Sequence, residues 1–248
     1  MIINRKYLKN KKLYKDNCGE SGFSGQLYTL EASDGVKYIV KTQLVDVLNE
    51  YVAHNVAKII DVPTSDAVLI VNNKNDVNVG IVYEPDFNSI NANVFLGTED
   101  SPLLADFMSY MALRNMLLID DNIQVAIVRN RLISFDYAEA FCFSELFLKL
   151  FITFGSRPWP ISVDLIEAFT RNLSIDLPNG YHNLLRIIKR ADAKPLREAY
   201  YAPMMKFQEA NFQSIIEELS SLFIPPIVEF YGECLRIIKE QTAKLLTN

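Results

Sequence analysis

The chain has 248 residues, of which 50% are hydrophobic and 22% are charged, and its formal net charge is −5. This balance predicts a folded soluble protein with a sizeable core and excludes fibrous and disordered classes. The negative charge argues against nucleic acid or an anionic membrane surface as a partner. The lysine-rich first 15 residues contain no apolar run, and no segment is long and apolar enough to span a bilayer. We therefore expect a cytoplasmic protein that binds neither nucleic acid nor membrane.

Short runs of β-type sequence dominate the first half. Strands are predicted over residues 8–14, 25–32, 37–42, 67–73 and 79–85, with turn-forming SDG and NNKND segments between some of them. One helix interrupts the strands. Apolar residues recur at helical spacing over residues 48–60, and Pro63 follows the end of this pattern. The first half is thus predicted to be a sheet with one helix.

Helical patterns dominate the second half, with one exception. Residues 125–136 form a predicted hairpin whose apolar arms flank a tight Arg-Asn-Arg turn. The last helix, over residues 226–246, carries one apolar stripe that we assign to core packing: Ile227, Phe230, Tyr231, Cys234, Leu235 and Ile238. The element order predicts an α+β fold with a sheet lobe followed by a helical lobe.

The segment CGESGFSGQLYTLEASDGVKYIVKT, residues 18–42, places three glycines before a strand-turn-strand pattern. Its candidate phosphate-binding residues are Gly19, Ser21, Gly22, Ser24 and Gly25. Glycines let the backbone approach a ligand closely, and successive free N–H groups can hold anionic oxygens. Serines in such a loop hydrogen-bond phosphate, are sites of self-phosphorylation, or simply favour the turn. An ordinary hairpin turn is the alternative interpretation.

Lys41 stands at the end of the apolar strand YIVK, where a buried strand usually carries an apolar or solvated residue. Glu50 lies early in the next helix, on a face that can meet this lysine. In kinase sites a strand lysine binds phosphates while a helix glutamate holds its flexible stem. The alternative is a pair of surface charges that contribute little to stability.

These motifs resemble the amino-terminal lobe of the HipA-like kinases, which share the protein-kinase and phosphoinositide-kinase-like fold. The resemblance rests on GxSGxSG, on DGVKYIVK and on NEYVAHNVAKIIDVPTSDAVLI, and it covers residues 5 to 145. It implies a two-lobed ATP-binding protein with a β-rich lobe at residues 1–86 and a mainly helical lobe at residues 87–248. It also implies that Lys41 contacts the α- and β-phosphates, that Glu50 is its partner, and that backbone groups from Val82 to Glu84 meet the adenine.

Phosphoryl transfer also needs oxygen ligands for magnesium and a carboxylate that orients the attacking hydroxyl. Asp136 follows the strand LISF and resembles the metal-binding aspartate of this fold, although a turn-forming aspartate is the alternative. Asp120 and Asp121 are candidates for the catalytic carboxylate. Gln124 stands where HipA-like kinases have a metal-binding asparagine, and its carbonyl oxygen also suits magnesium. A shifted alignment would instead place Asn122, which cannot act as a base, at the catalytic position.

The leading functional hypothesis is ATP- and Mg²⁺-dependent phosphoryl transfer to a hydroxyl, with a protein serine or threonine as the acceptor. A pseudokinase that binds nucleotide or protein without catalysis is the alternative, because the loop before the hairpin is atypical. Phosphorylation of a small molecule is the third hypothesis, since fold does not determine the acceptor. A regulatory protein partner is also compatible with this family.

The other polar features are interpreted as structural. His54 and His182 have no histidine, cysteine or carboxylate cluster near them in sequence, so they are assigned to packing or to the surface. The basic residues between Arg5 and Lys15 are assigned to an edge strand, where charge prevents unwanted strand pairing.

Overall fold

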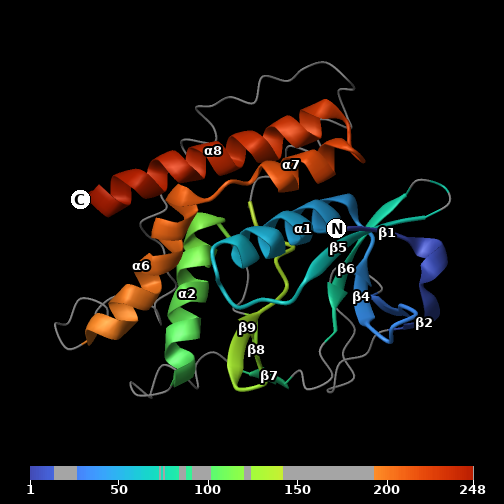
Figure 1. Cartoon of the computed structure of the whole chain (residues 1–248), viewed down its shortest axis with the longest axis horizontal. Coiled ribbons are helices and arrows are strands. Elements are labelled where there is room, and N and C mark those ends of the chain that lie inside the picture. Colours follow the sequence, from blue (N-terminus) through green and yellow to red (C-terminus); the bar gives the residue numbers. More distant parts are fainter. Residues whose placement is uncertain are drawn as a thin grey trace.

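The computed structural model describes residues 1–13, 27–72, 74, 76–83, 88–90, 102–119, 124–141 and 193–247. Within these ranges the first half of the chain forms a six-stranded sheet and one long helix, and the second half is mainly helical. Figure 1 shows the sheet on one side of the molecule and helices α2 and α6 on the other. The predicted α+β organisation is confirmed.

The larger sheet has the strand order β1-β5-β6-β4-β3-β2. Its strands are β1 (Ile2–Asn4), β2 (Lys9–Leu13), β3 (Tyr28–Glu31), β4 (Lys37–Lys41), β5 (Ala67–Val71) and β6 (Val77–Val82). All five strands predicted in the first half are present; four have shorter bounds, and β6 is shifted from the predicted 79–85 to Val77–Val82. The basic strand β2 lies at an edge of the sheet, as expected. Sequence analysis did not predict β1, which pairs in parallel with β5 at the other edge.

Helix α1 (Leu44–Ile59) crosses the molecule between the sheet and the helical half. It begins four residues before the predicted start at residue 48. Its N-cap residue, Gln43, makes no side-chain capping bond, which explains why the sequence contains no start signal there. The helix ends as predicted, because Asp61 has a φ of 58° and the Val62 N–H bonds back to the Ala57 carbonyl.

The second sheet is small and has the order β7-β8-β9. Its strands are β7 (Asn88–Ile90), β8 (Val125–Val128) and β9 (Arg131–Ser134). The β8–β9 pair confirms the predicted hairpin. Arg129 and Asn130 at its tip both have positive φ, 49° and 62°, as a two-residue type I′ turn requires. An isolated parallel bridge between Thr64 and Ser134 links this hairpin to the segment that precedes β5.

The described helices of the second half are α2 (Pro102–Met116), α6 (Lys194–Glu209), α7 (Gln213–Ser220) and α8 (Pro225–Thr247). Helix α2 packs along α6, and α8 packs on both α6 and α7. Every residue of the stripe predicted on the last helix is buried. The lobe boundary predicted at residue 86 falls in residues 84–87, outside the described residues.

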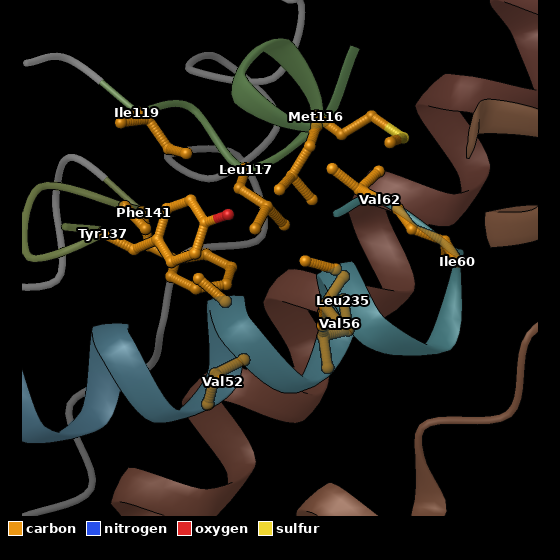
Figure 2. Packing of buried hydrophobic residues seen from close by; sticks show 14 of the residues in the cluster. Val52, Val56, Ile60, Val62, Met116, Leu117, Ile119, Tyr137, Phe141 and Leu235 are labelled. Atoms are coloured by element: carbon orange, nitrogen blue, oxygen red, sulfur yellow. The ribbon is translucent and has the colours of Figure 1, made fainter. Parts of the chain in front are cut away.

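The largest hydrophobic cluster is continuous across both halves of the chain. It includes Val52 and Val56 of α1, Leu69 of β5, Phe107 of α2 and Leu235 of α8, all buried. Figure 2 shows Val52 and Val56 among side chains that come from α8 and from the segments after α2 and β9. Because α1 supplies apolar residues to this shared core, its position relative to both sheets is fixed by packing.

Gly80, inside β6, permits a close approach between β6 and its neighbours, and this gives a stability prediction. A Cβ atom at this position would lie 2.6 Å from Ile70 Cδ1 and 3.2 Å from Tyr38 Cδ1. We expect Gly80→Ala to lower the free energy of unfolding by about 1 to 3 kcal/mol through overpacking. Urea denaturation measures this change.

The matched control is Gly232→Ala in α8, where the nearest atom to an added Cβ, Ile216 Cδ1, is 3.7 Å away. This substitution should raise the free energy of unfolding by about 0.5 to 1 kcal/mol, because alanine favours a helix interior. Equal effects of the two substitutions would contradict the assigned role of Gly80.

Candidate functional site

Three charged side chains from different parts of the fold meet beside α1. The Lys41 ammonium at the end of β4 donates to Glu50 Oε1 in α1 and to Asp136 Oδ1 after β9, the second bond being 2.6 Å long. The Lys41 and Glu50 side chains are 6% and 0% exposed, whereas the Asp136 side chain is 33% exposed. The surface-charge alternative for Lys41 and Glu50 is therefore wrong.

The local structure explains how these residues meet. Lys41 pairs with Val79 in the neighbouring strand, at the end of β4 that leads into α1. Glu50 lies in the second turn of α1, where the helix passes the end of β4. Asp136 has a φ of 60°, in the left-handed region that residues other than glycine rarely occupy.

The charges of Lys41 and Glu50 stabilise each other, whereas the charge of Asp136 is stabilised only in part. Burial disfavours the charged form of Lys41, but the adjacent carboxylates of Glu50 and Asp136 outweigh burial and raise the pKa of Lys41. Burial also opposes ionisation of Glu50, yet Lys41 holds the pKa of Glu50 well below its usual range. Burial raises the pKa of Asp136, and Lys41 only partly offsets this effect. The pair of Lys41 and Glu50 is thus an ion pair.

Sequence analysis assigned no role to Asn49, the residue before Glu50. Asn49 is buried; its Nδ2 donates to the Ala138 carbonyl at 2.6 Å, and its Oδ1 accepts from the Tyr231 hydroxyl at 2.7 Å. The asparagine therefore connects α1 to the segment after Asp136 and to α8. In the sequence, the only indication of a role for Asn49 was its place in the NEYVA motif.

His54, one turn after Glu50, is also part of the buried network. Its Nε2 lies 3.2 Å from Glu50 Oε2, and its Nδ1 lies 2.7 Å from Thr64 Oγ1. The imidazole packs edge-on against the Tyr137 ring, with ring centroids 4.6 Å apart. The interpretation of His54 as a packing residue is correct in part, because the ring also makes these polar contacts. Two residues separated from His54 in sequence, Thr64 and Tyr137, complete its surroundings and could not be identified from local spacing.

Asp46 adds a further negative charge near Lys41. It lies in the first turn of α1 and is only 9% exposed. Burial raises its pKa to about 6; Lys41 opposes the shift, and the carboxylates of Glu50, Asp136 and Glu139 add to it. The candidate site thus contains more acidic than basic groups, which suits a ligand that brings cations.

The other predicted site residues are placed as follows. Gln124 immediately precedes β8 and is partly buried. Its backbone carbonyl accepts a 3.2 Å hydrogen bond from the N–H of Phe135, the residue before Asp136. The N–H groups of Val82 and Tyr83 donate within the sheet, to Asp66 and Lys37. The adenine contact of Val82 stays a prediction. The remaining predicted residues lie outside the described residues: Gly19, Ser21, Gly22, Ser24, Gly25, Glu84, Asp120 and Asp121.

The described part of the chain contains neither a self-sufficient metal cluster nor a membrane span. No group of three or more histidine, cysteine or carboxylate side chains there could by itself hold a metal ion. A magnesium ion that shares its ligands with phosphates needs only one or two protein carboxylates. None of the described helices combines the length and hydrophobicity that crossing a bilayer requires.

Comparison with solved structures identifies the fold. The crystal structure of a Helicobacter pylori proinflammatory kinase, CtkA, superposes with a TM-score of 0.61, at 12% sequence identity, over 98% of this chain and 95% of that chain. No family model matches the sequence. No curated protein matches it either. The chain thus has the two-lobed α+β kinase-like fold expected from the sequence, while HipA-like membership is not established.

The raised pKa of Asp46 predicts a pH-dependent effect on stability. Its pKa is about 6 in the folded chain, against an ordinary value of 3.8. The protonated Asp46 side chain therefore contributes fully to the free energy of unfolding below about pH 4, and this contribution is lost as the pH rises through 6. Asparagine cannot ionise, so Asp46→Asn should raise the free energy of unfolding more at pH 7.5 than at pH 4. We expect the two changes to differ by about 2 kcal/mol.

Urea denaturation of the nucleotide-free protein across this pH range measures the effect. Asp66→Asn, at an exposed position, controls for the general removal of one negative charge. An effect of Asp46→Asn that is independent of pH would contradict the assignment.

Proposed function

We propose that this chain is an ATP- and Mg²⁺-dependent kinase that transfers a phosphoryl group to a hydroxyl, with a protein serine or threonine as the acceptor. The observation that carries the proposal is the buried Lys41 ammonium, held by Glu50 from α1 and facing Asp136. One carboxylate is enough to neutralise a buried lysine, so charge balance alone does not explain the second carboxylate. The kinase-like fold supports the same conclusion but does not identify the acceptor.

In this proposal Lys41 binds phosphate oxygens and Glu50 orients it. A lysine side chain is long and flexible, so a fixed carboxylate reduces the entropy lost when its ammonium engages a ligand. The Glu50 side chain is 0% exposed and cannot be reached by a phosphate group, whereas Lys41 lies between it and the more open Asp136. Lys41 therefore keeps its contact with Glu50 and exchanges part of its contact with Asp136 for a ligand oxygen.

Asp136 and Gln124 are the proposed magnesium ligands. The donor set fits this ion, because magnesium prefers carboxylate and amide oxygens and shares its coordination with substrate phosphates. The partial exposure of Asp136 leaves one side of its carboxylate accessible. When bound, ATP supplies the phosphoryl group and magnesium neutralises the charge that develops on it.

The acceptor hydroxyl requires a carboxylate to orient it and accept its proton, and we assign this role to Asp120 or Asp121. The glycine loop, from Gly19 to Gly25, is proposed to cover the phosphates. HipA-like identity, a cytoplasmic location and a regulatory protein partner belong to the same proposal and rest on the sequence resemblance. A small-molecule hydroxyl is the alternative acceptor.

A pseudokinase is the second candidate function, and Gln124 is the observation that favours it. Asparagine is the usual residue at this position, and the additional methylene of glutamine displaces the carbonyl oxygen that would bind magnesium. Retention of Lys41, Glu50 and Asp136 with this change is compatible with nucleotide binding without phosphoryl transfer.

Nucleotide binding is tested by thermal unfolding with and without ATP and Mg²⁺. A ligand that binds only the native state raises the midpoint, by about 5 to 10 °C at a hundredfold excess over Kd. Asp136→Asn should abolish the magnesium-dependent part of this rise, because the ion loses its carboxylate ligand. Lys41→Met should abolish most of the rise and also lower the midpoint without ligand, because Glu50 is left buried without its cation.

The matched controls are Lys58→Met and Asp66→Asn, which remove the exposed ion pair between α1 and the segment before β5. Both should keep the full rise. Absence of any rise in the wild-type protein would contradict nucleotide binding. A rise without transfer of labelled terminal phosphate to protein or small-molecule hydroxyls would favour the pseudokinase.

A further inference from the structure

His54 and Glu50 leave a buried polar pair that packing alone does not explain. Both side chains are 0% exposed, and Glu50 Oε2 and His54 Nε2 have no regular hydrogen-bond partner among the described residues. The two atoms lie 3.2 Å apart. Leaving a polar atom buried without a partner is costly, so these two atoms are held together by their mutual electrostatic interaction.

The chemistry of the partners assigns the histidine hydrogens. Glu50 is ionised beside Lys41, and a carboxylate only accepts hydrogen bonds. Nε2 must therefore carry a hydrogen toward Glu50. In the neutral ring Nδ1 is then an acceptor 2.7 Å from the Thr64 hydroxyl, whose one hydrogen can also be donated to the Ser134 carbonyl 3.2 Å away. One imidazole thus links the carboxylate of α1 to a hydroxyl that lies before β5.

Thr64 continues the link toward Asp136. The Tyr137 hydroxyl lies 3.2 Å from Thr64 Oγ1 and within hydrogen-bond distance of the Ser134 hydroxyl, and its one hydrogen can be donated to either. Ser134 also donates, through its hydroxyl and its backbone N–H, to the Pro63 carbonyl at 3.1 Å. Residues 134 and 137, on either side of Asp136, are therefore attached to the segment that His54 contacts.

The contacts form a closed circuit. It runs from Lys41 to Glu50, through His54 and Thr64 to the segment 134–137, and back from Asp136 to Lys41. Closed networks restrict each member more than separate pairs do, because no member can move alone. A leucine at position 54 would fill the apolar surroundings of α1 but would remove the imidazole contact of the second Glu50 oxygen.

We propose that His54 is a positioning residue of the nucleotide site. It orients the Glu50 carboxylate toward Lys41 and, through Thr64, fixes the distance between α1 and the segment that carries Asp136. This inference rests on the proposed function, since the group it positions is the phosphate-binding Lys41. His54 itself does not contact the nucleotide.

The test uses three substitutions that retain different parts of the imidazole. His54→Gln places an amide near the Nε2 position, His54→Asn places one near the Nδ1 position, and His54→Leu retains neither polar group. The measured quantity is the Kd for ATP with Mg²⁺ of the folded full-length chain. We expect His54→Leu and His54→Asn to weaken binding about tenfold, the effect typical of losing an outer-shell orienting partner. His54→Gln should restore most of the affinity.

A double-mutant cycle separates positioning from packing. If His54 acts through Glu50, the effect of His54→Leu on Kd should largely disappear in a Glu50→Gln background. Val56→Ala, a core substitution on the same helix, is the matched control; it should lower the unfolding midpoint and leave Kd unchanged. An unchanged Kd in His54→Leu, an equal loss in the Glu50→Gln background, or equal rescue by asparagine and glutamine would overturn the inference.

Failure of the proposed function is a distinct outcome. If the wild-type protein does not bind ATP with Mg²⁺, the kinase proposal fails and the same variants are compared by urea denaturation without nucleotide. Coupling between His54→Leu and Glu50→Gln, with recovery by His54→Gln only, would retain the orienting role toward Glu50. Additive shifts of the urea midpoint would overturn it.

Discussion

The buried ion pair between Lys41 and Glu50 holds the large sheet and α1 together, and through Asp136 it also reaches the second half of the chain. Removing both charges from water is costly, and their attraction repays this cost only when geometry and additional hydrogen bonds are maintained. The pair therefore requires that β4 and α1 keep one relative position. Asp136 adds the same requirement for the segment after β9. The left-handed backbone of Asp136 is the local strain that accompanies this arrangement.

Stability alone would favour a different composition beside α1. Apolar side chains of similar volume often stabilise a core at least as well as a buried ion pair does. Asn49, Glu50 and His54 instead place three polar side chains on a helix that is otherwise rich in Val, Ala and Leu. Each has a polar neighbour in another segment or in its own helix, which reduces the free-energy cost of burying it. Polar groups retained at a core position in this way are expected where a site must be preorganised.

Much of this arrangement could be predicted from the sequence, for identifiable reasons. Alternation and turn residues located β3 to β6 and the β8–β9 hairpin, and helical spacing located α1 and α8. Lys41 was recognised because a charged residue at the end of an apolar strand is unusual. Glu50 was recognised by its place early in the next helix, and Asp136 by its resemblance to a metal-binding aspartate after a short strand. By contrast, β1 has three residues and gains its structure only from pairing with β5. The roles of His54 and Asn49 depend on Thr64, Ala138 and Tyr231, contacts between distant segments that local spacing does not encode.

The burial of α1 has a consequence for how such a protein can be controlled. Of its sixteen residues, eleven are buried, and they contact the large sheet, the hairpin segment and α8. Kinases in which the equivalent glutamate helix rotates outward use that motion as an off state. Here an outward rotation would expose core side chains of both halves to water and separate Asn49 from Tyr231. Under the proposed function, an off state would therefore have to be reached with α1 left in place.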